Sequence, residues 1–252
     1  MKCLIRQPIR LVWPLLWTAS IFADEIKTLP PPITNDTVKP ADNFTLIVLP
    51  DTQGYADTRH RETQKHWPEI GDQRACFFGQ TEWIKKNHEA RNITLVTHVG
   101  DITQTEHDDE WKIADAAFKT IESHIPYVLC SGNHDMGYLP QLRKTSQSRA
   151  SQFSRYFPPS RFTKNPLYDA HFAPEKERHF REAGKTENYY LFFQASGMDF
   201  LVITLEFKPR DEAIAWANQV AERHPGHRII VLTHGYLTEK GRLSESDGYP
   251  IK

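Results

Sequence analysis

Four polar motifs of this sequence contain side chains that bind divalent metals, and each motif directly follows an apolar run. The motifs are Asp51-Thr52-Gln53, Gly100-Asp101, Gly132-Asn133-His134-Asp135 and Thr233-His234. Asp, Asn and His together suit borderline metals such as Mn, Fe or Zn, whereas Ca prefers an all-oxygen site. A carboxylate can also bridge two ions, and such a pair can hold the attacking and leaving oxygens of a phosphoryl displacement. The four motifs together indicate a metal site for phosphate chemistry.

Taken alone, some of these motifs have a structural explanation. Asp51 fits a turn residue or a helix N-cap, and His234 fits a hydrogen-bonded structural histidine. The motif 132–135 is harder to explain in this way, because three polar side chains follow an apolar run. Agreement among four motifs favours metal binding over the structural explanation.

The apolar runs have the length and composition of β-strands. They are short, rich in β-branched and aromatic residues, and bounded by Pro, Gly, Asn or Asp. The predicted strands are residues 45–49, 93–99, 127–130, 189–193, 200–205 and 228–233. Most lack a polar alternation, as expected of strands covered on both faces. Parallel strands place their carboxyl ends together, so the four motifs are expected to meet at one edge.

Three amphipathic patterns between the strands predict helices over Gln80–Glu89, Asp108–Ser123 and Arg210–Arg223. Their apolar residues recur at spacings of three or four, which places Trp83 and Ile214 among the expected core residues. The alternation of strands and helices predicts an α/β fold.

The polar stretch 137–185 interrupts this alternation and is predicted to be an insertion that forms a substrate-side cap. Its arginines have two interpretations, contact with an anionic substrate or solvated surface, and they are Arg143, Arg149, Arg155 and Arg161. Its aromatic residues are expected to pack the insertion onto the domain, and they include Tyr156, Phe157 and Phe162.

The bulk composition bounds the class of protein. A chain of 252 residues is long enough for one α/β domain, predicted over residues 44–252. The net charge of -1 argues against a general nucleic-acid binder, which would carry a basic excess. Cys76 and Cys130 are the cysteines beyond the N-terminal segment, and two cysteines cannot form a disulfide scaffold.

Residues 1–23 have the features of a signal peptide. Basic residues precede the apolar stretch 11–22, and a small residue, Ala23, follows it. The stretch is short for a membrane span and contains Pro14, so an uncleaved anchor is the second interpretation. The sequence predicts export to the periplasm or the extracellular space, with no stable membrane span after cleavage. Residues 24–43 are predicted to be an extended linker.

In their order along the chain, the four motifs resemble those of calcineurin-like metallophosphoesterases, in particular the secreted bacterial branch. The resemblance runs from about Phe44 to His234. It implies a four-layer α/β/β/α sandwich with two mixed central sheets and a dinuclear metal centre. It also implies hydrolysis of a phosphate mono- or diester, in which a hydroxide that bridges the metals attacks phosphorus directly.

The resemblance gives each motif residue a role. The implied metal ligands are Asp51 and Gln53 for the first ion, Asp101 for both ions, and Asn133 and His234 for the second. His134 would be the general acid or a transition-state donor near the leaving group, and Asp135 would orient its ring. The family's first motif is usually Asp-x-His, so Gln53 offers the first ion a weaker ligand than imidazole.

The last motif of the family, Gly-His-x-His, has no counterpart between Gly235 and Lys252. Gly226-His227 does not replace it, because this pair precedes a predicted strand and lacks the second His. The resemblance therefore implies a fragment that ends before the closing strands of the second sheet. The alternative is a non-catalytic extracellular binding module that keeps the fold with an incomplete metal site.

Overall fold

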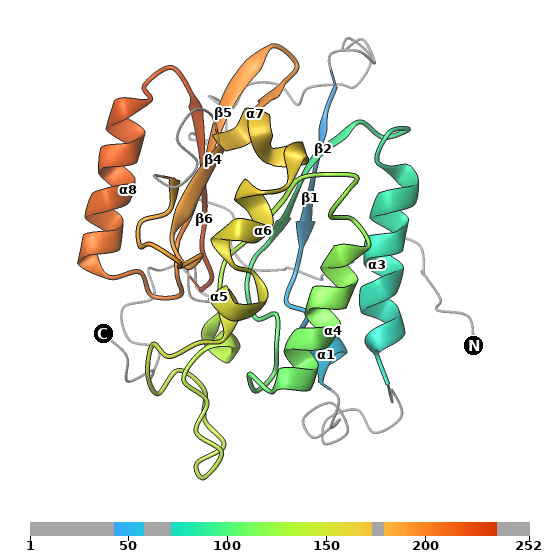
Figure 1. Ribbon diagram of the computed structural model, residues 1–252, viewed down its shortest axis with the longest axis vertical. Coiled ribbons are helices and arrows are strands. Elements are labelled where there is room, and N and C mark those ends of the chain that lie inside the picture. Colours follow the sequence, from blue (N-terminus) through green and yellow to red (C-terminus); the bar gives the residue numbers. More distant parts are fainter. Residues whose placement is uncertain (1–42, 58–71, 173–178, 236–252) are drawn as a thin grey trace, which may run out of the picture. The chain divides into compact units, whose positions relative to one another are not determined.

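Two three-stranded sheets lie at the centre of the computed structural model, which describes residues 43–57, 72–172 and 179–235 (Figure 1). These residues belong to one structural unit, Asn43–Lys252. The predicted signal peptide 1–23, the linker up to residue 42 and the chain after Gly235 lie outside the described residues.

The first sheet contains β1 (Thr45–Leu49), β2 (Ile93–His98) and β3 (Tyr127–Leu129), in that order. Both of its strand pairs are parallel. The expectation of a mixed first sheet is therefore wrong for its described strands. The physical reason is the connectivity, because helical crossovers join successive strands and return the chain to the same end of the sheet.

The second sheet contains β4 (Tyr189–Ala195), β5 (Met198–Thr204) and β6 (Arg228–Leu232). β4 and β5 form an antiparallel hairpin, and β6 pairs with β5 in parallel, so this sheet is mixed as expected. All six predicted strands are present, with bounds that differ from the predicted ones by no more than two residues.

Helices connect and cover the strands. They are α1 (Gln53–Ala56), α3 (Arg74–Asn87), α4 (Asp108–Lys119) and α8 (Asp211–Arg223). In Figure 1, α3 and α4 flank the first sheet, while α8 flanks the second. The α/β class is confirmed, whereas the four-layer arrangement stays a prediction. No helix in the described ranges has both the length and the apolar character that a membrane crossing needs.

The second sheet shows the alternation of a strand with two different faces. Leu201 and Ile203 of β5 pack against Ala217 and Val220 of α8 in a small apolar cluster. Val202, between them in sequence, belongs to the large core shared with the first sheet. Successive side chains of a strand point to opposite faces, so β5 contributes to both cores.

The stretch predicted as an insertion contains four short helical elements. They are α5 (Phe153–Tyr156), α6 (Pro159–Thr163), η5 (Pro166–Tyr168) and α7 (Asp169–Phe172). Phe157 and Phe162 are fully buried in the large core, and the Tyr156 ring stacks on Trp111 at 5.8 Å. The predicted packing of these aromatic residues is confirmed. The role of 137–185 as a cap stays a prediction, and residues 173–178 lie outside the described ranges.

Two expected core residues are exposed instead. Trp83 is 40% exposed, and Ile214 is 43% exposed. Helix α3 begins at Arg74, six residues before the predicted start, and it buries Phe77 and Ile84. These buried positions define a face that excludes Trp83, whose ring lies under the guanidinium of Arg91.

β6 also lacks a polar alternation in its sequence, yet the residues that the structure describes do not cover both of its faces. Ile229 and Val231 are 43% and 56% exposed. β6 pairs with one neighbour among the described strands, and its alternate residues, Ile230 and Leu232, pack against the large core. One face of the strand is therefore open in the described part of the chain.

Candidate metal centre

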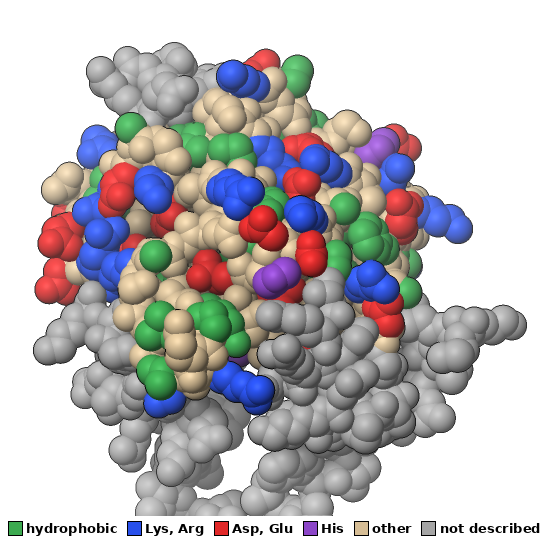
Figure 2. All heavy atoms as spheres, turned by 60° about the horizontal axis from the view of Figure 1, so that its bottom comes forward, with side chains coloured by type: hydrophobic (Ala, Val, Ile, Leu, Met, Phe, Trp, Pro, Cys, Tyr) green, Lys and Arg blue, Asp and Glu red, His purple; other side chains and the backbone are tan. Residues whose placement is uncertain are grey.

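The loops that follow the strands meet at the carboxyl end of the first sheet. The backbone N–H groups of Thr52 and Gln53 donate to the carbonyl oxygen of Asp101 at 3.0 and 2.8 Å. His134 N donates to the Asp101 carboxylate at 2.8 Å, and the His234 ring reaches the same carboxylate. β1 points toward the lower edge of Figure 1, and Figure 2 presents that face, where acidic and basic side chains surround a histidine. The structure thus brings the four motifs together.

Two glycines make this close approach possible. A Cβ on Gly132 would lie 2.2 Å from the backbone N of Asp101, which no side chain can occupy. Gly100 has a φ of +98°, and its Cβ would lie 2.8 Å from the N of Gly132 and 3.0 Å from the Cβ of His234. The glycines are required because backbone and side chains of three motifs pack where these Cβ atoms would be.

Asp101 lies at the centre of the site. It has a φ of +51°, an uncommon conformation for a residue with a side chain, and only 3% of its surface is exposed. Its carboxylate accepts hydrogen bonds from the backbone N of His134 at 2.8 Å and from Nε2 of Gln53 at 3.1 Å. Burial raises the pKa of Asp101 to about 6, and the neighbouring His234 opposes this shift. A nearby cation would offset the free-energy cost of burying this charged carboxylate.

The His234 ring faces oxygen atoms through both of its nitrogens. Nδ1 lies 2.9 Å from the carbonyl oxygen of Val99, an acceptor, so Nδ1 carries the proton of the neutral ring. Nε2 then presents a lone pair, yet it lies 3.0 Å from Oδ1 of Asn133 and 3.5 Å from Oδ2 of Asp101. The Asn133 amide can rotate to donate, but a carboxylate cannot. With the ring neutral and Oδ1 of Asn133 facing it, three electron-pair donors converge on one point, which is the arrangement of a metal site.

Asp51 and Gln53 lie at the edge of this convergence. Oδ1 of Asp51 is 3.8 Å from Nδ1 of His234, the nitrogen that already faces Val99, and the Asp51 side chain is half exposed. Oε1 of Gln53 is buried and has no hydrogen-bond partner among the residues that the structure describes. Such an orphaned acceptor fits a ligand atom for a cation.

The described residues contain no group of three or more His, Cys, Asp and Glu side chains that is close enough to hold a metal ion. The convergence at His234 instead combines one imidazole, one carboxylate and one amide. Asp51 does not complete a charged triad, because it approaches His234 from the Nδ1 side. The donor set nevertheless fits a divalent ion, on the observations at His234 Nε2 and Gln53 Oε1.

His134 and Asp135 differ from the expected pair. Nδ1 of His134 is 2.7 Å from the carbonyl oxygen of Gln104, which fixes the ring. Asp135 is fully buried, and its carboxylate accepts from the N–H groups of Gly132, Ile102 and Thr103 at 2.8, 3.0 and 2.8 Å. The expectation that Asp135 orients the His134 ring is therefore wrong, because these backbone donors occupy its oxygens. Asp135 instead joins its own motif to the Asp101 loop.

His98 is a site residue that the sequence motifs missed. The backbone N–H of Gly100 donates to Nδ1 of His98 at 3.1 Å, so the proton lies on Nε2, which is 3.0 Å from Oγ1 of Thr52. Burial lowers the pKa of His98 to about 3, and the ring stays neutral. His98 thus holds the loop after β1 against the loop after β2. The available signal was a histidine at the end of an apolar strand, two residues before Gly100.

Three of the four arginines considered for substrate contact are paired with carboxylates. Arg155 lies 3.1 Å from Asp108, and Arg161 pairs with both Asp115 and Glu122. Arg149 lies 3.4 Å from Glu206 and donates to the carbonyl oxygens of the loop after β5. These arginines bind the stretch 137–172 to the rest of the unit.

The comparisons agree with this geometry. The family model of the calcineurin-like phosphoesterases matches residues 44–250, and the chain belongs to this family. Its members are phosphoesterase hydrolases that typically use divalent metals. One similar protein is the uncharacterized protein YvnB of Bacillus subtilis (strain 168), 33% identical over 215 residues. The match covers 84% of this chain and 14% of that protein, so the chain spans a small part of the relative's length.

Proposed function

We propose that this chain hydrolyses a phosphate mono- or diester at a site for two divalent metal ions, with Mn, Fe and Zn as the candidates. The observation that carries the proposal is the convergence of Asp101 Oδ2, Asn133 Oδ1 and the His234 Nε2 lone pair. The orphaned Oε1 of Gln53 supports it from the other side of Asp101. The family match favours hydrolysis and does not favour the non-catalytic binding module.

The first motif supplies the proposed ligands of one ion, and the third and fourth motifs supply those of the other. They are Asp51 and Gln53 for one ion, Asn133 and His234 for the other, and Asp101 for both. Ions held there would activate water and offset negative charge on the phosphoryl oxygens. The protein's own contribution is to hold these donors in a buried place by the glycine contacts and by the Asp135 carboxylate.

His134 is the proposed general acid for the leaving oxygen. Its Nδ1 faces Gln104 O, so the ring in its protonated form presents the Nε2 proton away from this contact. The backbone N of the same residue binds Asp101, which fixes the ring beside the ligands. We further propose that the chain is exported, on the sequence of residues 1–23.

The test compares two Asp→Asn variants after removal of metal by a chelator. Hydrolysis of p-nitrophenyl phosphate and bis(p-nitrophenyl) phosphate is measured on adding back Mn, Zn or Fe(II), and bound metal is counted by equilibrium dialysis. We expect metal-dependent turnover that Asp101→Asn lowers at least about 100-fold, together with loss of metal binding. The matched control is Asp199→Asn, an exposed position on β5, which should behave as the wild type. Full turnover in the chelated chain, or in Asp101→Asn, would overturn the proposal.

A further inference from the structure

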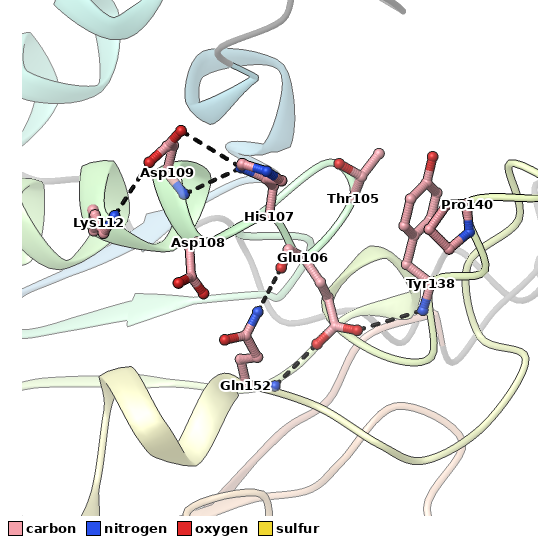
Figure 3. A pocket seen from close by; sticks show the side chains of 9 residues that line it. All are labelled: Thr105, Glu106, His107, Asp108, Asp109, Lys112, Tyr138, Pro140 and Gln152. Atoms are coloured by element: carbon pink, nitrogen blue, oxygen red, sulfur yellow. Dashed lines mark hydrogen bonds and ion pairs between the residues drawn. The ribbon is translucent and has the colours of Figure 1, made fainter.

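A cavity of about 690 Å³ lies between the loop that leads into α4 and the segment after His134 (Figure 3). Thr105, Glu106 and Asp108 line it on one side, and Tyr138 with Pro140 forms the other. The Tyr138 ring and the Thr105 side chain stand at the same part of its rim in Figure 3. None of these residues belongs to the proposed metal ligands.

The two walls of this cavity run directly from His134. Gln104 O binds Nδ1 of His134 at 2.7 Å, and two residues further on Glu106 accepts from the backbone N of Tyr138 at 3.4 Å. The loop and the segment therefore lie side by side from the proposed general acid to the cavity. Tyr138 follows His134 by four positions in the sequence, which an extended chain spans in at most about 14 Å. The cavity thus opens beside the segment that carries the proposed general acid.

The walls are fixed before any ligand binds. The buried Glu110 accepts from both the backbone N and Oγ1 of Thr105, at 2.8 and 2.9 Å. Glu106 accepts from the backbone N of Gln152 at 3.0 Å, and the Gln152 side chain donates to the Glu106 carbonyl oxygen at 2.7 Å. Glu106 has a φ of +54°, a conformation that these contacts hold in place. A preformed cavity loses little order on binding.

The carboxylates at the cavity already have hydrogen-bond or ion-pair partners. Asp108 pairs with Arg155 at 3.1 Å, and Asp109 pairs with Lys112 at 3.2 Å. The Glu106 carboxylate is bound by two backbone N–H groups. A cationic ligand would have to compete with these cations and N–H groups, and an anionic ligand would meet three carboxylates. The acceptor oxygens and the Tyr138 ring suit a neutral group with hydroxyls on its edge and C–H groups on its face.

We propose that this cavity binds the alcohol part of the phosphoester, and that it selects an uncharged, hydroxyl-rich group such as a sugar. The inference rests on the proposed hydrolysis, since it names the leaving group of that reaction. Tyr138 packs against the ring of this group, and the oxygens of Thr105 and Asp108 accept from its hydroxyls. Selection occurs through the ratio of kcat/KM for substrates that differ in the leaving group.

The first arm of the test uses two alkyl phosphates with similar leaving oxygens, glucose 6-phosphate and ethyl phosphate. We expect wild-type kcat/KM to favour glucose 6-phosphate at least about tenfold, and Tyr138→Ala to reduce this ratio about tenfold. Tyr138→Phe keeps the ring and should keep the ratio within about threefold. Leu142→Ala, an exposed position on the same segment, is the matched control and should not change it. An equal kcat/KM for both esters in the wild type would overturn the proposal.

The second arm needs no turnover, so it separates failure of this inference from failure of the proposed hydrolysis. Saturation-transfer NMR is recorded with glucose, ribose and glycerol on the chelated chain. A signal that is present in wild type and Leu142→Ala but lost in Tyr138→Ala supports the cavity even if no ester is hydrolysed. Absence of any signal in the wild type, or an equal signal in Tyr138→Ala, would overturn it.

Discussion

Arg161 and Asp101 are both buried charges, but the chain surrounds them differently. Arg161, in α6, is 7% exposed at its side chain and has two carboxylates beside it, Asp115 at 2.5 Å and Glu122 at 2.7 Å. Asp101 is buried to the same degree, yet its ion-pair partner among the described residues is His234 alone. That ring presents a lone pair when it is neutral.

The difference separates a buried charge that serves the fold from one that we expect to serve a ligand. Arg161 brings its own counter-charges, so the region of α5 to α7 is complete without any added ion. At Asp101 the neighbouring atoms are mostly further electron-pair donors, and burial raises the pKa of this carboxyl to about 6. An unpaired buried charge is costly. We therefore expect a bound cation to stabilise this site, whereas the region of α5 to α7 needs none.

His134→Ala separates proton donation from metal binding at this site, and it has the largest expected effect. The ring contacts Gln104 O, while the backbone N, which the substitution keeps, binds Asp101. We expect kcat for p-nitrophenyl phosphate to fall about 100- to 10,000-fold, the usual contribution of general acid catalysis. Metal affinity, measured by calorimetry, should change less than about threefold, because no proposed ligand is removed.

His124→Ala is the control for this substitution, because His124 is an exposed histidine outside the motifs. It should keep wild-type turnover and metal affinity. If His134→Ala keeps its turnover, the assigned role is wrong. If it instead loses metal, the ring belongs to the ligand set, and the division drawn between Asp101 and its neighbours must be revised.

The sequence predicted the parts of the site that depend on strand order. Apolar β-branched runs identified the strands, and parallel pairing placed Asp51 and Asp101 at the same edge. The sequence did not reveal what holds the His134 ring, because its partner is a backbone carbonyl, that of Gln104. Every residue has such a group, so its use depends on the tertiary fold alone.

The helices α5 to α7 were missed for a different reason. Each has four or five residues, which is too short to show a helical period in the sequence. Trp83 was misplaced because the start of α3 was set six residues late, which changed the face assigned to the core. Errors of this kind come from element boundaries, where local signals are weakest.

Removing one charge from each region tests the comparison by stability. Arg161→Leu leaves Glu122 without its ion-pair partner and Asp115 with Lys119 alone, and we expect a loss of about 3 kcal/mol in the free energy of unfolding. Asp101→Asn in the chelated chain should change this free energy by less than about 1 kcal/mol, or raise it, because an unpaired buried charge is removed. Urea unfolding, followed by far-UV circular dichroism, measures both.

The matched control for Arg161→Leu is Arg155→Ala, which breaks an exposed ion pair with Asp108 and should cost no more than about 1 kcal/mol. Two results would break the comparison. One is a loss at Asp101→Asn as large as at Arg161→Leu, which would make Asp101 a structural charge. The other is an Arg161→Leu variant as stable as Arg155→Ala, which would show that the buried pair is not required.

Glu106 tests the comparison on a smaller scale, because it is a partly buried carboxyl outside the proposed metal ligands that has no cationic partner among the described residues. Burial raises its pKa from an ordinary 4.5 to about 7, and the N–H groups of Gln152 and Tyr138 oppose the shift. The folded state thus binds this proton more tightly than the unfolded chain. Its stabilising contribution is complete below about pH 4.5 and is lost as the pH rises through 7.

We therefore expect the wild type to lose roughly 2 kcal/mol of unfolding free energy relative to Glu106→Gln between pH 5 and 8. The variant removes the titrating group, and subtracting the two pH profiles cancels the contributions of Asp101 and Asp135, whose pKa values burial also raises. Urea midpoints across this range, taken on chelated protein, give the difference. Parallel profiles would mean that Glu106 stays ionised in the fold, and that its two backbone N–H donors alone offset the cost of burial. A carboxyl would then need no added cation to be buried in this part of the molecule, which would weaken the same inference at Asp101.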